Sequence, residues 1–269
     1  MVSDRFEVIE GIRCYAPLLA RENSGFKEES FDQLYKLEEH NFWFEGRAKI
    51  LKYLFQRHLS EDKPVKFLEI GCGTGFMLNR LSGLNKVSLT GSEIYLAGLH
   101  FAQKRLPETE FIQLDATNIP FEGEYDAIGA FDVLEHIEPD EQVMRQVWRA
   151  LTKNGFFFIT VPQYRFMWSY LDDYSCHKRR YNRKELRDKL RKQGFEIKYL
   201  GSFVFTLFPL MVFSRMMKKK DRQNTKAEYE IPRIINGFFL GLMHLDFLLI
   251  RLGVSLPFGG SLVCVARKH

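Results

Sequence analysis

The chain has 269 residues, of which 45% are hydrophobic and 14% aromatic, and it carries a net charge of +5. This length and apolar content exclude a largely disordered protein and fit one α/β domain with additions. The small positive charge does not indicate a particular class of binding partner. The cysteines Cys14, Cys72, Cys176 and Cys264 form no C-x-x-C pair, which argues against a zinc knot or a disulfide framework. The first residues do not resemble a secretory signal, so we expect a cytoplasmic protein.

In chain order, residues 1–60 are expected to form an N-terminal helical cap, and residues 61–202 a core in which strands and helices alternate. The expected strands of this core cover residues 65–70, 87–93, 110–115, 125–131 and 155–161. The expected helices cover residues 76–84, 96–106 and 139–151. A hydrophobic helical insert at 203–256 follows, and residues 257–269 supply a last strand over 261–266.

Regular alternation of strand and helix predicts a parallel sheet with helices on both faces. Right-handed crossovers then bring the carboxyl ends of the strands to one edge of the sheet, where such sheets bind their ligands.

The insert contains two apolar stretches, Phe203–Ser214 and Gly237–Ile250, on either side of a basic segment with Lys218, Lys219 and Lys220. Neither stretch reaches the roughly 20 residues that cross a bilayer. An apolar helix beside basic residues can instead lie at an anionic membrane surface, or cover a pocket for a lipid-linked acceptor. A homodimer interface and an enlarged core are the alternative interpretations.

The strongest motif is the glycine-rich turn Gly71-Cys72-Gly73-Thr74-Gly75, which lies between a buried strand and a helix. Glycines permit positive φ and a close approach of ligand, and the helix start offers free N–H groups. The spacing G-x-G-x-G differs from the dinucleotide fingerprint G-x-G-x-x-G. A tight turn without a ligand is the alternative.

Two acids follow at the carboxyl ends of successive strands. Glu93 can accept the two hydroxyls of a ribose, and Asp115 can accept an adenine amino group. Together they favour a bound adenosine.

The run LEIGCGTG at 68–75, the acid Glu93, the pair Asp115-Ala116 and the run FDVLEHI at 131–137 resemble the motifs of class I S-adenosylmethionine-dependent methyltransferases. The likeness is to the broad group that includes ubiquinone-pathway O-methyltransferases, and it covers about residues 40–200 plus the last strand. It implies a Rossmann-like, doubly wound seven-stranded sheet, mostly parallel with the last strand antiparallel. It also implies S-adenosyl-L-methionine as cofactor and methyl transfer to a small-molecule or lipid-linked acceptor. The insert departs from the family pattern.

The resemblance assigns the glycine loop to the methionine part of the cofactor, Glu93 to the ribose, Asp115 with Ala116 to the adenine, and the Phe131 carbonyl to the amine. Arg47, close to the aromatic stretch Phe42-Trp43-Phe44, suits the cofactor carboxylate, and an arginine on a helix surface is the equal alternative. The residues expected to bind the cofactor are Arg47, Glu69, Gly71, Cys72, Gly73, Gly75, Glu93, Ile94, Asp115, Ala116 and Phe131.

The acceptor is expected to meet the segment that follows the strand at 155–161. His177 can act as a general base near neutral pH, and His136 is the second catalytic candidate. Arg180, Tyr181 and Trp43 are the candidate substrate residues, with packing of the cap as the alternative for Trp43.

Asp132, Glu135 and His136 form a D-x-x-E-H cluster, which some relatives of the ubiquinone type use for magnesium and metal-free relatives also carry. We predict no metal. The basic residues at 184–192 are interpreted as a solvated helix face, without a nucleic-acid partner.

Two other functions stay open at this point. A nicotinamide-dependent oxidoreductase would use a similar fold but another glycine spacing, and a non-catalytic membrane-associated scaffold could keep the fold without activity. Calorimetry with S-adenosylhomocysteine and NADH separates these alternatives.

Overall fold

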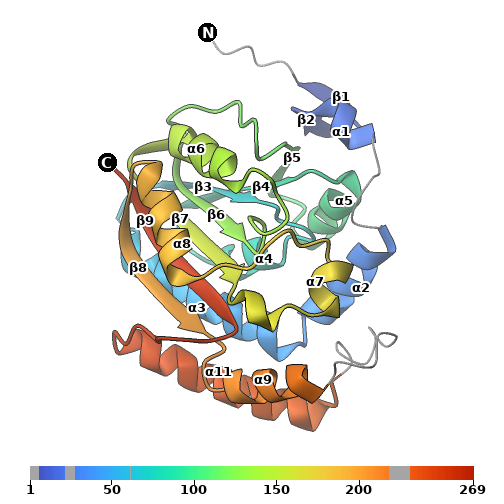
Figure 1. The fold of residues 1–269 in the computed structure, drawn as a ribbon. Helices are drawn as coiled ribbons and strands as arrows, with labels where there is room; N and C mark the ends of the chain where they lie inside the picture. Colours follow the sequence, from blue (N-terminus) through green and yellow to red (C-terminus); the bar gives the residue numbers. More distant parts are fainter. Residues whose placement is uncertain (1–5, 22–27, 61, 218–230) are drawn as a thin grey trace.

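The protein is described from a computed structural model, which covers residues 6–21, 28–60, 62–217 and 231–269 (Figure 1). The basic residues Lys218, Lys219 and Lys220 of the insert lie outside these ranges.

Within the described residues a nine-stranded sheet has the order β1-β2-β5-β4-β3-β6-β7-β9-β8. The strands are β1 (Glu7–Ile9), β2 (Ile12–Cys14), β3 (Val65–Ile70), β4 (Val87–Glu93), β5 (Glu110–Gln113), β6 (Tyr125–Phe131), β7 (Leu151–Pro162), β8 (Phe195–Phe203) and β9 (Ser261–Lys268). The five strands from β5 to β7 are mutually parallel, and β9 runs antiparallel to both of its neighbours. The expected Rossmann-like class with an antiparallel last strand is therefore confirmed.

The two strands beyond the expected seven form a hairpin, β1–β2, that extends the sheet next to β5. The expectation of a purely helical cap over residues 1–60 is thus wrong. Glu10 and Gly11 form the turn, both with positive φ (52° and 79°), as in the two-residue turns that match strand twist. Each strand has three residues, too few for an alternating pattern to identify it in the sequence.

The helices flank the sheet and continue into the N-terminal region and the insert (Figure 1). They are α1 (Pro17–Arg21), α2 (Glu28–Glu38), α3 (Phe42–His58), α4 (Phe76–Leu81), α5 (Leu96–Arg105), α6 (Asp140–Ala150), α7 (Tyr170–Tyr174), α8 (Arg183–Lys192), α9 (Phe208–Met217) and α11 (Arg233–Arg251), with a short 3-10 turn η1 at Arg165–Met167.

Successive side chains of the strands pack into two cores, one on each face of the sheet. On β3, Phe67 faces a core that α3, α4, α5 and α11 complete, whereas Leu68 and Ile70 face a core completed by α6 and α8. Helices on both faces make the sheet doubly wound, and both faces of its central strands are buried.

The insert is attached to the core through α11, which packs along α3. A Cβ at Gly46 of α3 would lie 2.6 Å from Met243 Cε, so glycine is what lets the two helices come so close. Asp246 of α11 is buried, and its carboxylate accepts the N–H groups of Phe205 (2.6 Å) and Thr206 (3.1 Å) ahead of α9.

The second apolar stretch of the insert has 14 residues in the sequence, and for that reason it was not expected to span a bilayer. The helix that forms there, α11, has 19 residues and meets the length and composition of a membrane span. Its contacts with α3 nevertheless hold it against the folded domain.

Candidate functional site

The glycine-rich loop joins β3 to α4 at the carboxyl edge of the sheet. Gly71, Gly73 and Gly75 all have positive φ (65°, 51° and 76°). A Cβ at Gly71 would lie 2.5 Å from Val133, whereas a Cβ at Gly73 would meet nothing within 4 Å. The loop is therefore fixed on its sheet side and open at Gly73, where a ligand can approach the backbone.

Glu93, the last residue of β4, reaches across to this loop. Its carboxylate accepts the N–H groups of Gly73 (3.1 Å) and Ile94 (2.8 Å). Burial raises the pKa of Glu93, and these N–H groups oppose the rise. The structure thus joins the acid and the glycine loop at one edge of the sheet, as the sequence expected.

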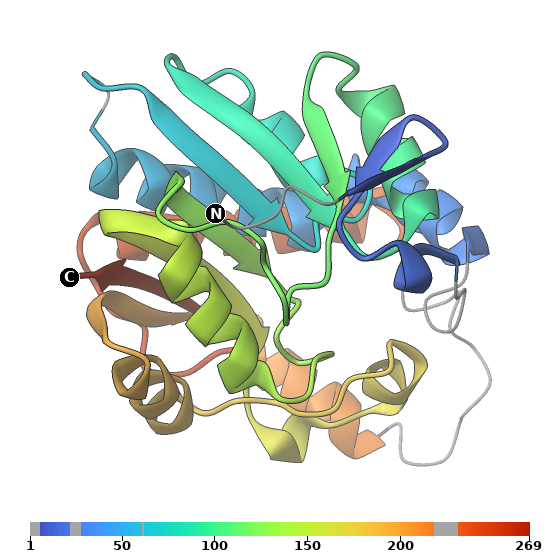
Figure 2. The ribbon, with the colours of Figure 1, turned by 90° about the horizontal axis from the view of Figure 1, so that it is seen from above.

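The next strand ends complete that edge. Asp115 and Ala116 come just after β5, and Asp115 accepts the N–H of Thr117 at 2.8 Å. Phe131 is the last residue of β6, which neighbours β3. Figure 2 shows β3 and β4 running side by side toward the same edge. The residues expected to bind the cofactor at the ends of four strands therefore lie along the carboxyl edge of the sheet.

Two buried ionisable groups near the loop keep polar atoms without a partner among the described residues. They are Glu69 Oε2 in β3 and Arg47 Nε in α3. Burial raises the pKa of Glu69 to about 8, and the positive charge of Arg47 opposes that rise. Arg47 pairs with Asp132 and lies over the ring of Trp43 at 4.5 Å. These orphaned groups and the open backbone at Gly73 fit the ammonium and carboxylate of a bound amino-acid moiety.

The sequence reasoning missed a network that fixes the loop from the side of α2. Glu38 is buried, accepts a hydrogen bond from the Thr74 hydroxyl and pairs with Arg105 at 2.9 Å. Arg105 also donates to the Thr74 carbonyl at 2.9 Å. The sequence of helix α2, which precedes α3, has no pattern from which this contact could be predicted.

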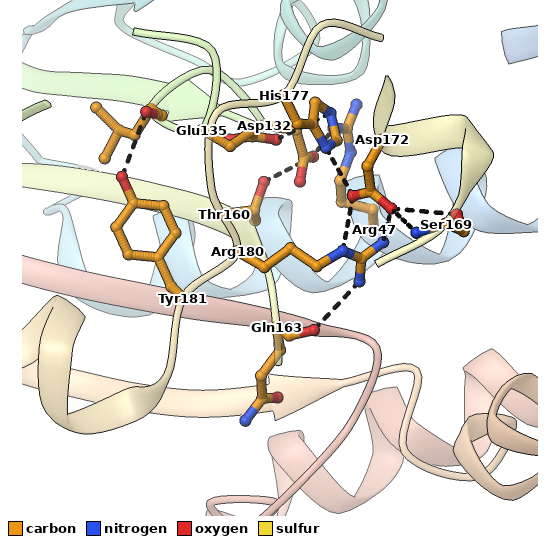
Figure 3. A network of polar contacts seen from close by, with 11 residues as sticks. Arg47, Asp132, Glu135, Thr160, Gln163, Ser169, Asp172, His177, Arg180 and Tyr181 are labelled. Atoms are coloured by element: carbon orange, nitrogen blue, oxygen red, sulfur yellow. Dashed lines mark hydrogen bonds and ion pairs between the residues drawn. The ribbon is translucent and has the colours of Figure 1, made fainter. Parts of the chain in front are cut away.

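The segment 163–182, which follows β7, is the part of the site expected to meet the acceptor. His177 Nδ1 lies 2.9 Å from Asp172 Oδ1, and Arg180 Nε donates to the same oxygen at 2.6 Å (Figure 3). Burial alone would raise the pKa of Asp172, but the hydrogen bonds from His177 and Arg180 lower it. Because Asp172 is ionised, the proton of neutral His177 resides on Nδ1 and its Nε2 keeps a lone pair.

Glu135 and His136 lie beside His177. The Glu135 carboxyl is fully buried without a hydrogen-bond partner among the described residues, and its Oε1 lies 4.0 Å from His177 Nε2. Burial and then the Asp132 charge raise its pKa well above the usual range. Burial and then His177 lower the pKa of His136 to about 4, which makes His136 a weak base.

The candidate ligand atoms of Glu135, His136 and His177 lie within 4.8 Å of one another, a grouping that could hold a metal ion. The expectation that the enzyme uses no metal stays a prediction.

Two substrate expectations need correction. Tyr181 is fully buried, and its hydroxyl donates to Asp140 Oδ2 at 2.6 Å beneath α6, so it cannot contact an acceptor. The Arg180 guanidinium is paired with Asp172 and donates to the Gln163 carbonyl at 3.2 Å. It therefore positions Asp172 and is not free to bind an anionic substrate group. Trp43 stays a prediction, half-buried at the start of α3.

Asp172 was also missed, although the sequence carries a signal for it. Ser169 and Asp172 form a capping box at the start of α7, in which Ser169 N donates to Asp172 Oδ2 at 2.7 Å. The cap gives a reason for an acid at this position. Its second role, as partner of His177, depends on a turn that no sequence pattern marks.

Comparison with known proteins bears on this geometry. A family model described as a methyltransferase domain matches residues 37–200. Over 172 residues the chain is 26% identical to a probable S-adenosylmethionine-dependent methyltransferase of Mycolicibacterium smegmatis, covering 62% of this chain and 65% of the relative. Over 99 residues it is 40% identical to the phthiotriol/phenolphthiotriol dimycocerosates methyltransferase of Mycobacterium leprae, covering 34% of this chain and 35% of the relative. The chain thus matches less than two thirds of each relative.

Among solved structures, phosphoethanolamine N-methyltransferase 2 of Haemonchus contortus, in complex with S-adenosyl-L-methionine, superposes with a TM-score of 0.60. The match covers 94% of this chain and 59% of that one at 15% identity, so it shows the fold alone.

Proposed function

Since the chain belongs to the family of S-adenosylmethionine-dependent methyltransferases, we propose that it methylates a hydroxyl group of a lipid-linked acceptor. The comparisons give no support to the nicotinamide-dependent oxidoreductase or to the non-catalytic scaffold. The observation that carries the proposal is the hydrogen bond between His177 Nδ1 and Asp172 on the acceptor side of the strand-end site.

A hydroxyl acceptor explains why a base is needed. The cofactor, when bound, supplies a methyl group that is already activated by its sulfonium. The remaining tasks are to align the acceptor and to remove its proton. His177 Nε2 can take that proton because Asp172 orients the ring and stabilises the imidazolium that forms, while Arg180 keeps Asp172 ionised.

The lipid-linked class of acceptor is favoured by two observations. A relative of this chain is named for methylating phthiotriol and phenolphthiotriol dimycocerosates. In addition, an exposed aromatic residue of the segment 163–182 contacts a ring at the start of α9. Phe166, whose side chain is 66% exposed, lies against Phe208 with ring centroids 6.5 Å apart. An apolar acceptor would find a suitable surface beside the base.

The test has two stages. Calorimetry should show binding of S-adenosylhomocysteine and none of NADH. The protein is then incubated with methyl-labelled cofactor and either an amphiphilic secondary alcohol or the amine of the same chain length. Label in the ether, and not in the amine, supports a hydroxyl acceptor. Cofactor binding with label only in the amine would keep the methyltransferase and reject the base-assisted O-transfer.

A further inference from the structure

The long helix α11 presents an apolar stripe to solvent. Phe238, Leu245 and Leu248 are 63%, 46% and 49% exposed, and the stripe continues at the two ends of the helix to Ile234 and Leu252, which are 89% and 80% exposed. The spacings of four, seven, three and four residues put all five on one helical face. An exposed apolar face of this length on a folded protein marks an interaction surface.

The opposite face of α11 fixes its orientation. Met243, Phe247 and Ile250 are buried in the core with α3, and Asp246 is bonded to the segment before α9. Only 17% of an 18-residue apolar stretch of α11 is buried, so packing on the domain leaves most of the helix uncovered. To cross a bilayer, α11 would have to leave this core and carry Asp246 with it. The helix is therefore suited to lie along a surface.

Basic groups border the apolar stripe. Lys49 and Lys52 of α3 line a groove with Leu240 and His244 of α11, and Arg251 ends the helix. No carboxylate of the described part of the chain pairs with Lys49 or Lys52. The acid of this groove, Glu45, is paired with Arg80. The border of the stripe is thus positively charged.

A second apolar area continues from α9 toward the acceptor side of the site. Leu210, Phe213 and Met216 are 49%, 59% and 71% exposed. The residues that lead into α9 are tied to α11, since the Thr206 hydroxyl donates to the Leu242 carbonyl at 3.1 Å. Figure 1 draws both helices along the same side of the domain, below α3 and close to α7.

We propose that α9 and α11 dock this protein on the surface of an anionic lipid bilayer. The α11 stripe enters the headgroup region with its axis parallel to the membrane, and Lys49 and Lys52 meet lipid phosphates. Docking itself does not depend on the proposed function, but if the acceptor is lipid-linked as proposed above, docking holds the protein at the surface where that acceptor resides.

A second copy of the chain fits this face less well. In a two-fold dimer the same patch lies on both partners, so the basic border of one would approach that of the other. Lipid phosphates instead neutralise these charges, which is the charge complementarity that favours a membrane.

The experiment is vesicle flotation in the absence of cofactor and acceptor, so its result does not depend on methyl transfer. Vesicles of phosphatidylcholine, with and without phosphatidylglycerol, are mixed with wild type and with the double variant Phe238→Glu/Leu245→Glu. Leu18→Glu is the matched control, because Leu18 is 72% exposed on α1, away from the insert. Binding of S-adenosylhomocysteine checks the fold of each variant.

We expect wild type and Leu18→Glu to float with the anionic vesicles, and the double variant to lose at least about ten-fold in vesicle affinity. Lys49→Gln/Lys52→Gln should lose on the order of ten-fold on anionic vesicles only, and high salt should abolish that difference. Wild type that stays unbound, or a double variant that binds as well as wild type, overturns the proposal. The proposal would also be overturned if wild type formed a concentration-dependent dimer without binding vesicles, and if the double variant were monomeric. That result would assign the stripe to a second copy.

Discussion

The two halves of the site are built in different ways. The half predicted to bind the cofactor consists of Gly71, Gly73, Glu93 and Asp115, which stand at or just after the ends of neighbouring parallel strands. Their places follow from the sheet, and much of the binding surface is backbone. The acceptor half depends on side chains of the segment 163–182 that hold one another through the Asp172 carboxylate.

This difference has a consequence for how each half responds to change. A substitution at one strand end should affect mainly one part of the cofactor, because the sheet fixes the backbone of each strand end, although Glu93 also accepts the N–H of Gly73. In the acceptor half, His177 and Arg180 share Asp172, so a single change should disturb the whole group. Three predictions test this contrast.

The largest expected effect is at His177. His177→Ala should lower kcat by about 10²- to 10⁴-fold, the usual contribution of a positioned base, with unchanged affinity for S-adenosylhomocysteine. Single-turnover rates and calorimetry measure the two quantities. Asp172→Asn should also reduce kcat, because it leaves the ring of His177 without the carboxylate that orients it. Turnover of His177→Ala within two-fold of wild type would remove the base from the mechanism.

An intermediate effect is expected at Glu93. Glu93→Ala should weaken S-adenosylhomocysteine binding by about 1–3 kcal/mol, the cost of leaving hydrogen-bond partners unpaired, while kcat at saturating cofactor changes little. Isothermal calorimetry gives the affinity, and Glu108→Ala is the control, an exposed acid near the opposite end of β5. If Glu93→Ala bound cofactor as tightly as wild type, the ribose assignment would be lost.

The smallest effect concerns Glu69, whose pKa burial raises to about 8. At pH 7 the free protein holds this carboxyl mostly protonated, and the ammonium of a bound cofactor favours the charged form. Binding should therefore release up to about one proton, and affinity should rise with pH toward 8 by less than about 1.4 kcal/mol per unit. Calorimetry in two buffers of different ionisation enthalpy detects the release, and Glu69→Gln should abolish it. Equal enthalpies for wild type would show that Glu69 keeps its charge state.

Much of the sheet could be predicted because its central strands are buried on both faces. The bounds expected for β4 and β6 match those observed. Both strands end at a residue predicted to bind the cofactor. The hairpin β1–β2 was not expected, and β8, which completes the expected seven strands, was not located in the sequence. The hairpin is too short for periodicity, and β8 is half-buried or exposed from Glu196 to Leu200, where Lys198 and Tyr199 interrupt its pattern.

In the site, the strand-end residues could be placed from the sequence because the parallel topology fixes where they lie. Tyr181 could not, because a β-bridge between Gln163 and Tyr181 closes the segment at its base and turns the tyrosine under α6. Asp172 depends on the same closure. Contacts of this kind arise from tertiary packing and leave no local pattern.

The β1–β2 hairpin also bears on how the protein behaves at high concentration. Without it, β5 would present the unpaired backbone of Glu110–Gln113 as an open edge, which is a template for strand pairing between molecules. Instead Tyr15 N donates to the Gln113 carbonyl at 2.9 Å, and the new outer strand, β1, offers three residues. So short an edge is a poor template. The hairpin therefore leaves the sheet with an outer strand of three residues, and it covers the strand whose carboxyl end leads into Asp115.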